Sequence, residues 1–178
     1  PNSKYLVILR DLRDIICSFE SLLWKDVRVP IKVKGSEFDE MPFHQLPFEM
    51  RMKFYCKDIE SLLGRPLQML PHLTEVAQKN SNNFFLCRHE DFNKEPRETM
   101  QQIYQWLGEE NFEHDFDNIP KSDYYEHDTV YRALVNHKTG TKLKKLEPRW
   151  PKLMTDEQSK AVIANNQWYY ETFYPEAL

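Results

Sequence analysis

Arg10 and Ser18 are the residues of this sequence whose types and spacing best suit chemistry with an anion. In open α/β sheets, ligands bind beyond the carboxyl ends of strands, where a helix N-terminus already favours negative charge. We expect Arg10 to end such a strand and Ser18 to lie two turns into the following helix. A guanidinium fork with a hydroxyl donor suits a phosphate. A plainer interpretation is also open, in which Arg10 pairs with Asp14 or Asp91 and Ser18 only packs.

The segment that carries these residues is predicted to form a strand, a tight turn and a helix. Tyr5–Leu9 is a continuous apolar run, typical of a strand covered on both faces in a parallel sheet. Asp11 can cap the helix, and Asp14 suits its positive N-terminus. The helix has one apolar face, made of Ile15, Ile16, Phe19, Leu22 and Leu23.

A second strand, turn and helix follow later in the chain. Phe84–Cys87 is a short apolar run that predicts a strand, and Pro96 and Gly108 mark the start and the end of a helix. Two such units separated by helical sequence indicate an α/β domain with a parallel sheet flanked by helices.

Three further helices are predicted from apolar spacing and from their end signals. The first covers 46–63 and is stopped by Gly64 and Pro66, and the second runs from Pro71 to about Lys79. The last covers 155–173, where Thr155 and Gln158 have the spacing of a capping box.

Composition narrows the function classes. The 178 residues carry a net charge of −4, which argues against a general nucleic-acid binder. The three cysteines are widely spaced and odd in number, which favours reduced thiols and a cytoplasmic location. No apolar run approaches the length of about 18 residues that a membrane span needs. The scattered histidines lack metal-ligand spacing, so we expect no metal.

Because the chain enters a strand soon after Pro1, we expect it to be part of a longer protein.

The segment PNSKYLVILRDLRDIICSFES resembles the 3′-phosphate-binding segment of sulfotransferases that use 3′-phosphoadenosine 5′-phosphosulfate (PAPS). The family has a Pro-x-x-Lys lead-in, an apolar strand, an Arg, then Arg/Lys-Asp, and a Ser eight residues after the first Arg. Lys4, Arg10, Arg13 and Ser18 have that spacing. The resemblance therefore implies that Arg10 and Ser18 hold the 3′-phosphate, while Arg13 either contributes or points to solvent and pairs with an acid.

A second segment, FFLCRHEDFNKEPRETMQQIYQWLG, resembles the family's strand, Tyr-Glu-Asp-Leu, Pro and helix ending in Phe-Leu-Gly. Glu90, Asp91 and Pro96 agree with that pattern. His89 stands where the family has a Tyr near the adenine, so the resemblance implies that His89 stacks there. A polar residue at a strand end is the other interpretation of His89.

The segment HKTGTKLKK, residues 137–145, occupies the place of the family's basic loop that closes over the 3′-phosphate. By this resemblance Lys138, Lys142 and Lys144 belong to the donor site, although a solvated basic loop explains the lysines equally well. The segment lacks the GxxxxGK[ST] spacing of a P-loop, so we reject that interpretation.

Taken together, the resemblance implies the P-loop-NTPase-like sulfotransferase fold, with 1–178 as a single domain forming the C-terminal portion of the catalytic domain. PAPS would be the co-substrate, and an acceptor hydroxyl or amine of a small molecule, sugar or peptide would attack its sulfur. The family's 5′-phosphosulfate loop and general base precede this segment, so the catalytic residues are unknown. The acceptor site would lie around 37–70 and near Tyr124, Tyr125 and Tyr131. A nucleotide or nucleoside kinase-like domain and a non-catalytic α/β interaction domain remain the alternatives.

Overall fold

The computed structural model describes residues 3–23, 45–57, 61, 63–120 and 140–178. The chain is mostly helical and divides into two compact units, Pro1–Leu9 with Ser81–Glu147 and Arg10–Asn80 with Pro148–Leu178, called here the first and second units. Lys138, Tyr124, Tyr125 and Tyr131 lie outside the described residues, as does much of the expected acceptor region. Among the described residues, no helix combines the length and apolar character needed to cross a membrane.

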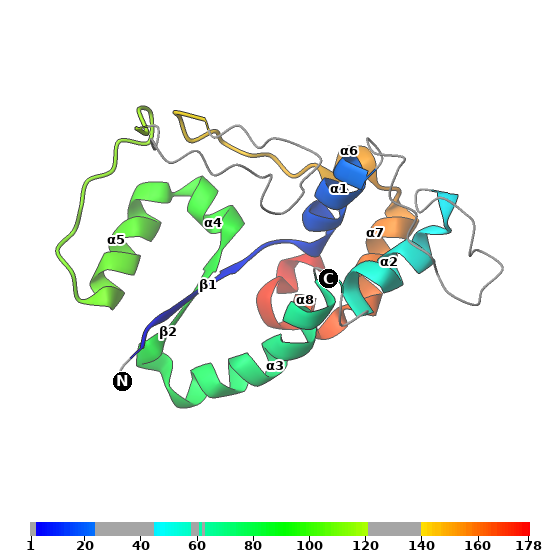
Figure 1. Cartoon of the computed structure of the whole chain (residues 1–178), viewed down its shortest axis with the longest axis horizontal. Coiled ribbons are helices and arrows are strands. Elements are labelled where there is room, and N and C mark those ends of the chain that lie inside the picture. The colour runs from blue at the N-terminus through cyan, green and yellow to red at the C-terminus, as the bar shows by residue number, and fades with distance from the viewer. Residues whose placement is uncertain (1–2, 24–44, 58–60, 62, 121–139) are drawn as a thin grey trace. The chain divides into compact units, whose positions relative to one another are not determined.

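The first unit is built on a parallel pair of strands (Figure 1). Its elements are β1 (Tyr5–Leu9), η2 (Ser81–Asn83), β2 (Phe84–Arg88), α4 (His89–Lys94) and α5 (Pro96–Leu107). Tyr5 pairs with Phe84 in register, and their rings stack with centroids 5.0 Å apart. Gly108 ends α5 in the left-handed conformation with φ 79°, as its position predicted. The two predicted strands and their parallel pairing are confirmed.

The burial predicted for β1 is wrong for the described chain. Tyr5, Leu6 and Ile8 keep 52%, 46% and 58% of their surface exposed, while Leu9 is buried. Among the described residues β1 has one neighbouring strand, so most of its side chains lack the cover that a central strand receives from helices on both faces.

The second unit is helical. Its elements are α1 (Leu12–Leu23), α2 (Phe48–Lys57), α3 (Gly64–Lys79), α6 (Trp150–Leu153), α7 (Asp156–Asn165), α8 (Gln167–Phe173) and η4 (Pro175–Ala177). Helix α1 packs against α6 and α7, and α2 packs against α3 and α7. Leu12, Ile16, Leu46, Val162 and Tyr170 are its most deeply buried side chains, so the core joins segments from both ends of the sequence.

The boundaries of α3 differ from the prediction. Gly64 begins this helix instead of ending the previous one, and its N–H donates to Ser61 Oγ at 2.8 Å. Pro66 falls in the first turn, where a missing N–H costs nothing, and Pro71 lies inside the helix instead of at its start. The Gly–x–Pro pattern serves a helix start as well as a helix end, which misled the prediction.

The last predicted helix is two helices. Thr155 and Gln158 form the predicted capping box at the start of α7. Asn166 breaks the helix with φ −130° and ψ 36°, and its side chain donates to the carbonyl of Val162 at 2.9 Å. Local side-chain bonding of this kind competes with continued helix. Helix α8 then begins at Gln167, and it carries the buried residues Tyr169 and Tyr170.

Candidate functional site

The turn between β1 and α1 is fixed by the two acids that the sequence placed at the helix start. Asp11 Oδ1 accepts from the backbone N–H of Arg13 at 2.9 Å, which is the predicted cap. Asp14 Oδ1 accepts from the backbone N–H groups of Arg149 and Trp150, at 2.8 and 3.1 Å. Asp14 therefore joins the start of α1 to the segment that enters α6.

Arg10 lies on this turn with its guanidinium only partly used. Its Nη2 is 3.5 Å from Asp14 Oδ2, and 27% of its side chain is exposed. Its Nε is buried and has no hydrogen-bond partner among the described residues. Asp91, the other acid considered for Arg10, lies in the first unit with its Oδ2 3.6 Å from Arg88 Nε. Arg10 thus keeps donor capacity that the described residues do not fill.

Arg13 is used differently. Its guanidinium forms a bidentate pair with Asp11, with Nε–Oδ1 at 3.0 Å and Nη2–Oδ2 at 2.5 Å, and Nη1 donates to Ser159 at 3.3 Å. The group also stacks over the ring of Trp150 at 3.9 Å. Burial opposes its charge, but the hydrogen bond and the charge of Asp11 outweigh burial and raise the pKa of Arg13. Its contacts among the described residues are those of a group that braces the turn.

Ser18 lies in the middle of α1 and is half-buried. Its hydroxyl has no hydrogen-bond partner among the described residues, so it is available as a donor. Ser21, one turn further along α1, instead bonds back to the carbonyl of Cys17 at 2.7 Å. The structure therefore leaves two polar side chains of the predicted phosphate site, Arg10 and Ser18, with capacity to bind.

The turn is also held by α8, which the sequence analysis did not connect with it. Tyr169 Oη donates to the carbonyl of Arg10 at 2.8 Å, and Tyr170 Oη donates to Asp11 Oδ1 at 3.0 Å. Burial and the charge of Asp11 raise the pKa of Tyr170, so its hydroxyl stays protonated. No spacing signal relates these partners, because they are 159 positions apart.

The remaining predicted donor residues that the structure describes belong to the first unit. His89 begins α4, and its ring nitrogens lie 3.3 and 3.0 Å from the side-chain amide of Asn93. Lys142 pairs with Asp117 at 2.5 Å, which raises the pKa of the lysine and lowers that of the acid. Lys144 is exposed and has no ion-pair partner among the described residues. Arg10, Arg13 and Ser18 are in the second unit.

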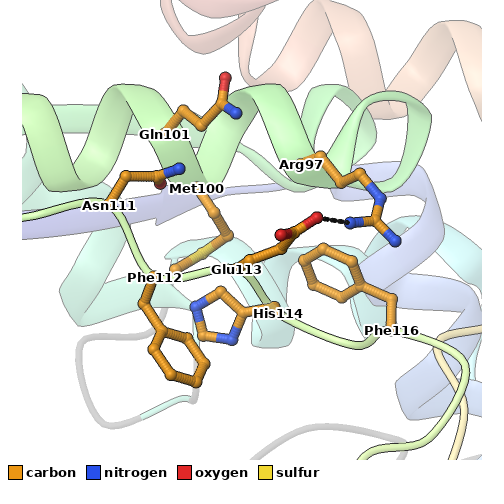
Figure 2. Close-up of a pocket in the computed structure, with 8 residues that line it drawn as sticks. All are labelled: Arg97, Met100, Gln101, Asn111, Phe112, Glu113, His114 and Phe116. Atoms are coloured by element: carbon orange, nitrogen blue, oxygen red, sulfur yellow. Dashed lines mark hydrogen bonds and ion pairs between the residues drawn. The ribbon is translucent and has the colours of Figure 1, made fainter.

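A cavity of about 210 Å³ lies beside α5 in the first unit (Figure 2). Arg97 and Glu113 pair across it at 3.4 Å, and the rings of Phe112, His114 and Phe116 lie along one side. His114 Nε2 is 3.0 Å from the hydroxyl of Tyr104. Arg97 and Arg10 each face one acid, at 3.4 and 3.5 Å, but only Arg10 also has a buried guanidinium nitrogen without a hydrogen-bond partner among the described residues.

Cysteine and metal chemistry find little support in the described residues. Cys17, Cys56 and Cys87 are free and buried, and burial raises the pKa of Cys17 and of Cys56 to about 11. Such thiols are poor nucleophiles at neutral pH. No group of three or more His, Cys, Asp or Glu within the described ranges is placed to hold a metal ion.

The comparison with protein families decides what kind of chain carries this turn. A family model described as sulfotransferase domain matches residues 1–167. The chain belongs to the sulfotransferase domain family. A search of curated proteins and a search of solved structures found no match. The matched range of this sulfotransferase domain includes the Arg10 turn and α1, and it ends at the first residue of α8.

Proposed function

We propose that this chain holds PAPS by its 3′-phosphate in an enzyme that moves a sulfuryl group to an acceptor hydroxyl or amine. Membership of the sulfotransferase domain family supports the reaction class. Arg10 and Ser18 support the donor-site role, because each keeps a hydrogen-bond donor without a partner among the described residues. Arg10 supplies the guanidinium for the phosphate oxygens, and Ser18 supplies a hydroxyl donor.

The observation that carries the proposal is the buried Nε of Arg10, which has no hydrogen-bond partner among the described residues. A buried donor without a partner costs about 1–3 kcal/mol, and a bound acceptor at Arg10 would relieve that cost. Asp14 lies against one terminal nitrogen of the same guanidinium, at 3.5 Å. The remaining donors suit a second, doubly charged acceptor such as a phosphate.

In the proposed reaction, the acceptor oxygen or nitrogen attacks the sulfur of PAPS while a base removes the proton of the acceptor. The bond between that sulfur and the 5′-phosphate oxygen breaks, and 3′-phosphoadenosine 5′-phosphate leaves with the bonding electrons. The contribution of Arg10 and Ser18 is to bind and orient the donor, since positioning of reactants accounts for much of the rate of such transfers. The base and the 5′-phosphosulfate loop are not assigned to residues of this chain, which we propose to be the C-terminal portion of the catalytic domain.

The other donor residues stay predictions. Arg13 has protein partners for its guanidinium, so we give it the role of bracing the turn and expect at most a small direct share in phosphate binding. His89 stays a prediction for the adenine, and Lys138, Lys142 and Lys144 stay predictions for a closing basic loop. A cytoplasmic location rests on the three free cysteines, and an acceptor of small-molecule, sugar or peptide type rests on the family.

Isothermal titration calorimetry of the intact protein with 3′-phosphoadenosine 5′-phosphate tests this function. Arg10→Ala should weaken binding by about 1.5–3 kcal/mol, the value of hydrogen bonds to a charged group. The matched control is Arg97→Ala, which removes an exposed arginine from the first unit and should leave affinity unchanged.

Unchanged affinity in Arg10→Ala would show that Arg10 does not hold the donor. Failure of the wild-type protein to bind the nucleotide at all would reject the donor-site role itself.

A further inference from the structure

Tyr169 holds the backbone of the proposed phosphate-binding arginine. Its hydroxyl donates to the carbonyl of Arg10 at 2.8 Å, and only 4% of its surface is exposed. The ring is fixed in turn by Phe173 and Tyr174, with centroids at 5.3 and 5.7 Å. A tyrosine packed in this way has little freedom, so its hydroxyl marks a fixed point for the turn.

The next residue of α8 and the next residue of the turn are joined by a hydrogen bond in the same way. Tyr170, which is fully buried, donates to Asp11 Oδ1 at 3.0 Å, and Asp11 in turn receives the guanidinium of Arg13. Two successive residues of α8 therefore bond to two successive residues of the turn. Neither tyrosine lies within residues 1–167, the range that the family model matches.

The guanidinium of Arg10 is restrained at its other end. Asp14 Oδ2 lies 3.5 Å from Nη2, and Asp14 itself is held by the backbone N–H groups of Arg149 and Trp150. Arg10 is thus fixed at its carbonyl by α8 and at its head group by the start of α1. Between these two points lies the buried Nε, which has no hydrogen-bond partner among the described residues.

We propose that Tyr169 is a positioning residue for the 3′-phosphate: it acts through the carbonyl of Arg10 and sets where the guanidinium lies. This inference rests on the proposed donor-site function. Binding groups must be held to within about 0.5 Å of their productive geometry, so loss of one fixed point weakens recognition of the group that Arg10 contacts. Recognition of the rest of the nucleotide does not depend on that point.

The test compares two nucleotides on the same protein samples. Calorimetry gives the Kd of the intact protein for 3′-phosphoadenosine 5′-phosphate and for adenosine 5′-monophosphate, which lacks the 3′-phosphate. We define the ratio as the Kd for adenosine 5′-monophosphate divided by the Kd for 3′-phosphoadenosine 5′-phosphate. This ratio measures recognition of the 3′-phosphate and does not depend on the folded fraction. Tyr169→Phe removes one oxygen and keeps the packed ring. We expect it to lower the ratio about 5- to 10-fold, which is the size of effect that one lost hydrogen bond gives.

Two controls separate positioning from general damage. Tyr104→Phe removes a tyrosine hydroxyl bonded to His114 in the first unit and should leave the ratio unchanged. In an Arg10→Ala background, Tyr169→Phe should have no further effect on the ratio, because the residue through which it acts is gone.

The outcomes distinguish the two proposals. A wild-type protein without preference for the 3′-phosphate would overturn the donor-site function and the positioning role together. A preference that Arg10→Ala abolishes and Tyr169→Phe preserves would overturn the positioning role alone. Equal weakening of both nucleotides by Tyr169→Phe would also overturn it, because a merely structural role affects both.

Discussion

At the scale of single residues, charged groups in the second unit divide into those satisfied by protein and those left open. Arg13 and Arg51 are both buried, and each is paired with an acid. Arg10 combines partial exposure with a buried nitrogen that lacks a partner among the described residues. Their positions in the sequence favoured Arg10 for the phosphate and left Arg13 open, and their contacts distinguish the two. That difference is the physical basis for assigning the phosphate to Arg10.

Arg51 and Glu20 provide a test of how buried charge supports the second unit. Arg51 Nε donates to Glu20 Oε1 at 2.6 Å, and Arg51 also donates to the carbonyl of Leu46. Arg51→Met leaves the acid unpaired and should lower the free energy of unfolding by about 3 kcal/mol. Urea titration followed by circular dichroism measures the change.

The double variant Arg51→Met with Glu20→Leu is the control for this pair. It removes both charges, so it should regain at least half of the lost stability. A double variant as unstable as the single one would mean that the packing of the Arg51 side chain, and not its charge, stabilises the second unit.

At the scale of elements, the strongest sequence signals are those that use local chemistry. Gly108 ends α5 and Thr155 caps α7 as predicted, because both effects depend on residues within one turn of each other. The start of α3 was missed because Ser61 bonds to the N–H of Gly64 in a turn that the Gly and Pro pattern does not reveal. The break at Asn166 was missed for a similar reason, since its side chain bonds to its own helix.

The capping box of α7 predicts a measurable stability effect. Thr155→Ala removes the acceptor for the N–H of Gln158, bonded at 3.2 Å, and should cost about 1 kcal/mol of unfolding free energy. Thr172→Ala is the matched control, because Thr172 only bonds back to the carbonyl of Trp168 within α8. A cost for Thr172→Ala equal to that of Thr155→Ala would contradict the capping role.

At the scale of the whole molecule, stability should fall at alkaline pH because of the buried thiols. Burial raises the pKa of Cys17 and Cys56 from 9.0 to about 11. Between these values the unfolded chain has lost the thiol protons and the folded chain keeps them. The folded state therefore binds more protons, and its stability decreases as pH rises from about 9 to 11. The loss is about 2 kcal/mol per thiol.

Denaturant titrations at a series of pH values check this expectation. The Cys17→Ala, Cys56→Ala variant should lose less stability than the wild type above pH 9, whatever its stability at neutral pH. Between pH 6 and 8 the two curves should run parallel, since the thiols are protonated in both states there. Parallel curves throughout the alkaline range would show that these thiols do not titrate differently on folding.

The amino-acid pattern was enough to predict the strand and helix around Arg10, the caps of α1, α5 and α7, and the family resemblance that the family match confirmed. These features depend on neighbours along the chain, so residue type and spacing are enough to find them. Two features are visible in the tertiary structure alone: Arg10 has a buried nitrogen without a hydrogen-bond partner among the described residues, and Tyr169 binds its carbonyl from 159 positions away. Contacts between distant segments are set by packing, which leaves no periodic signal in the sequence. The exposure of the β1 side chains likewise depends on which described elements lie beside that strand.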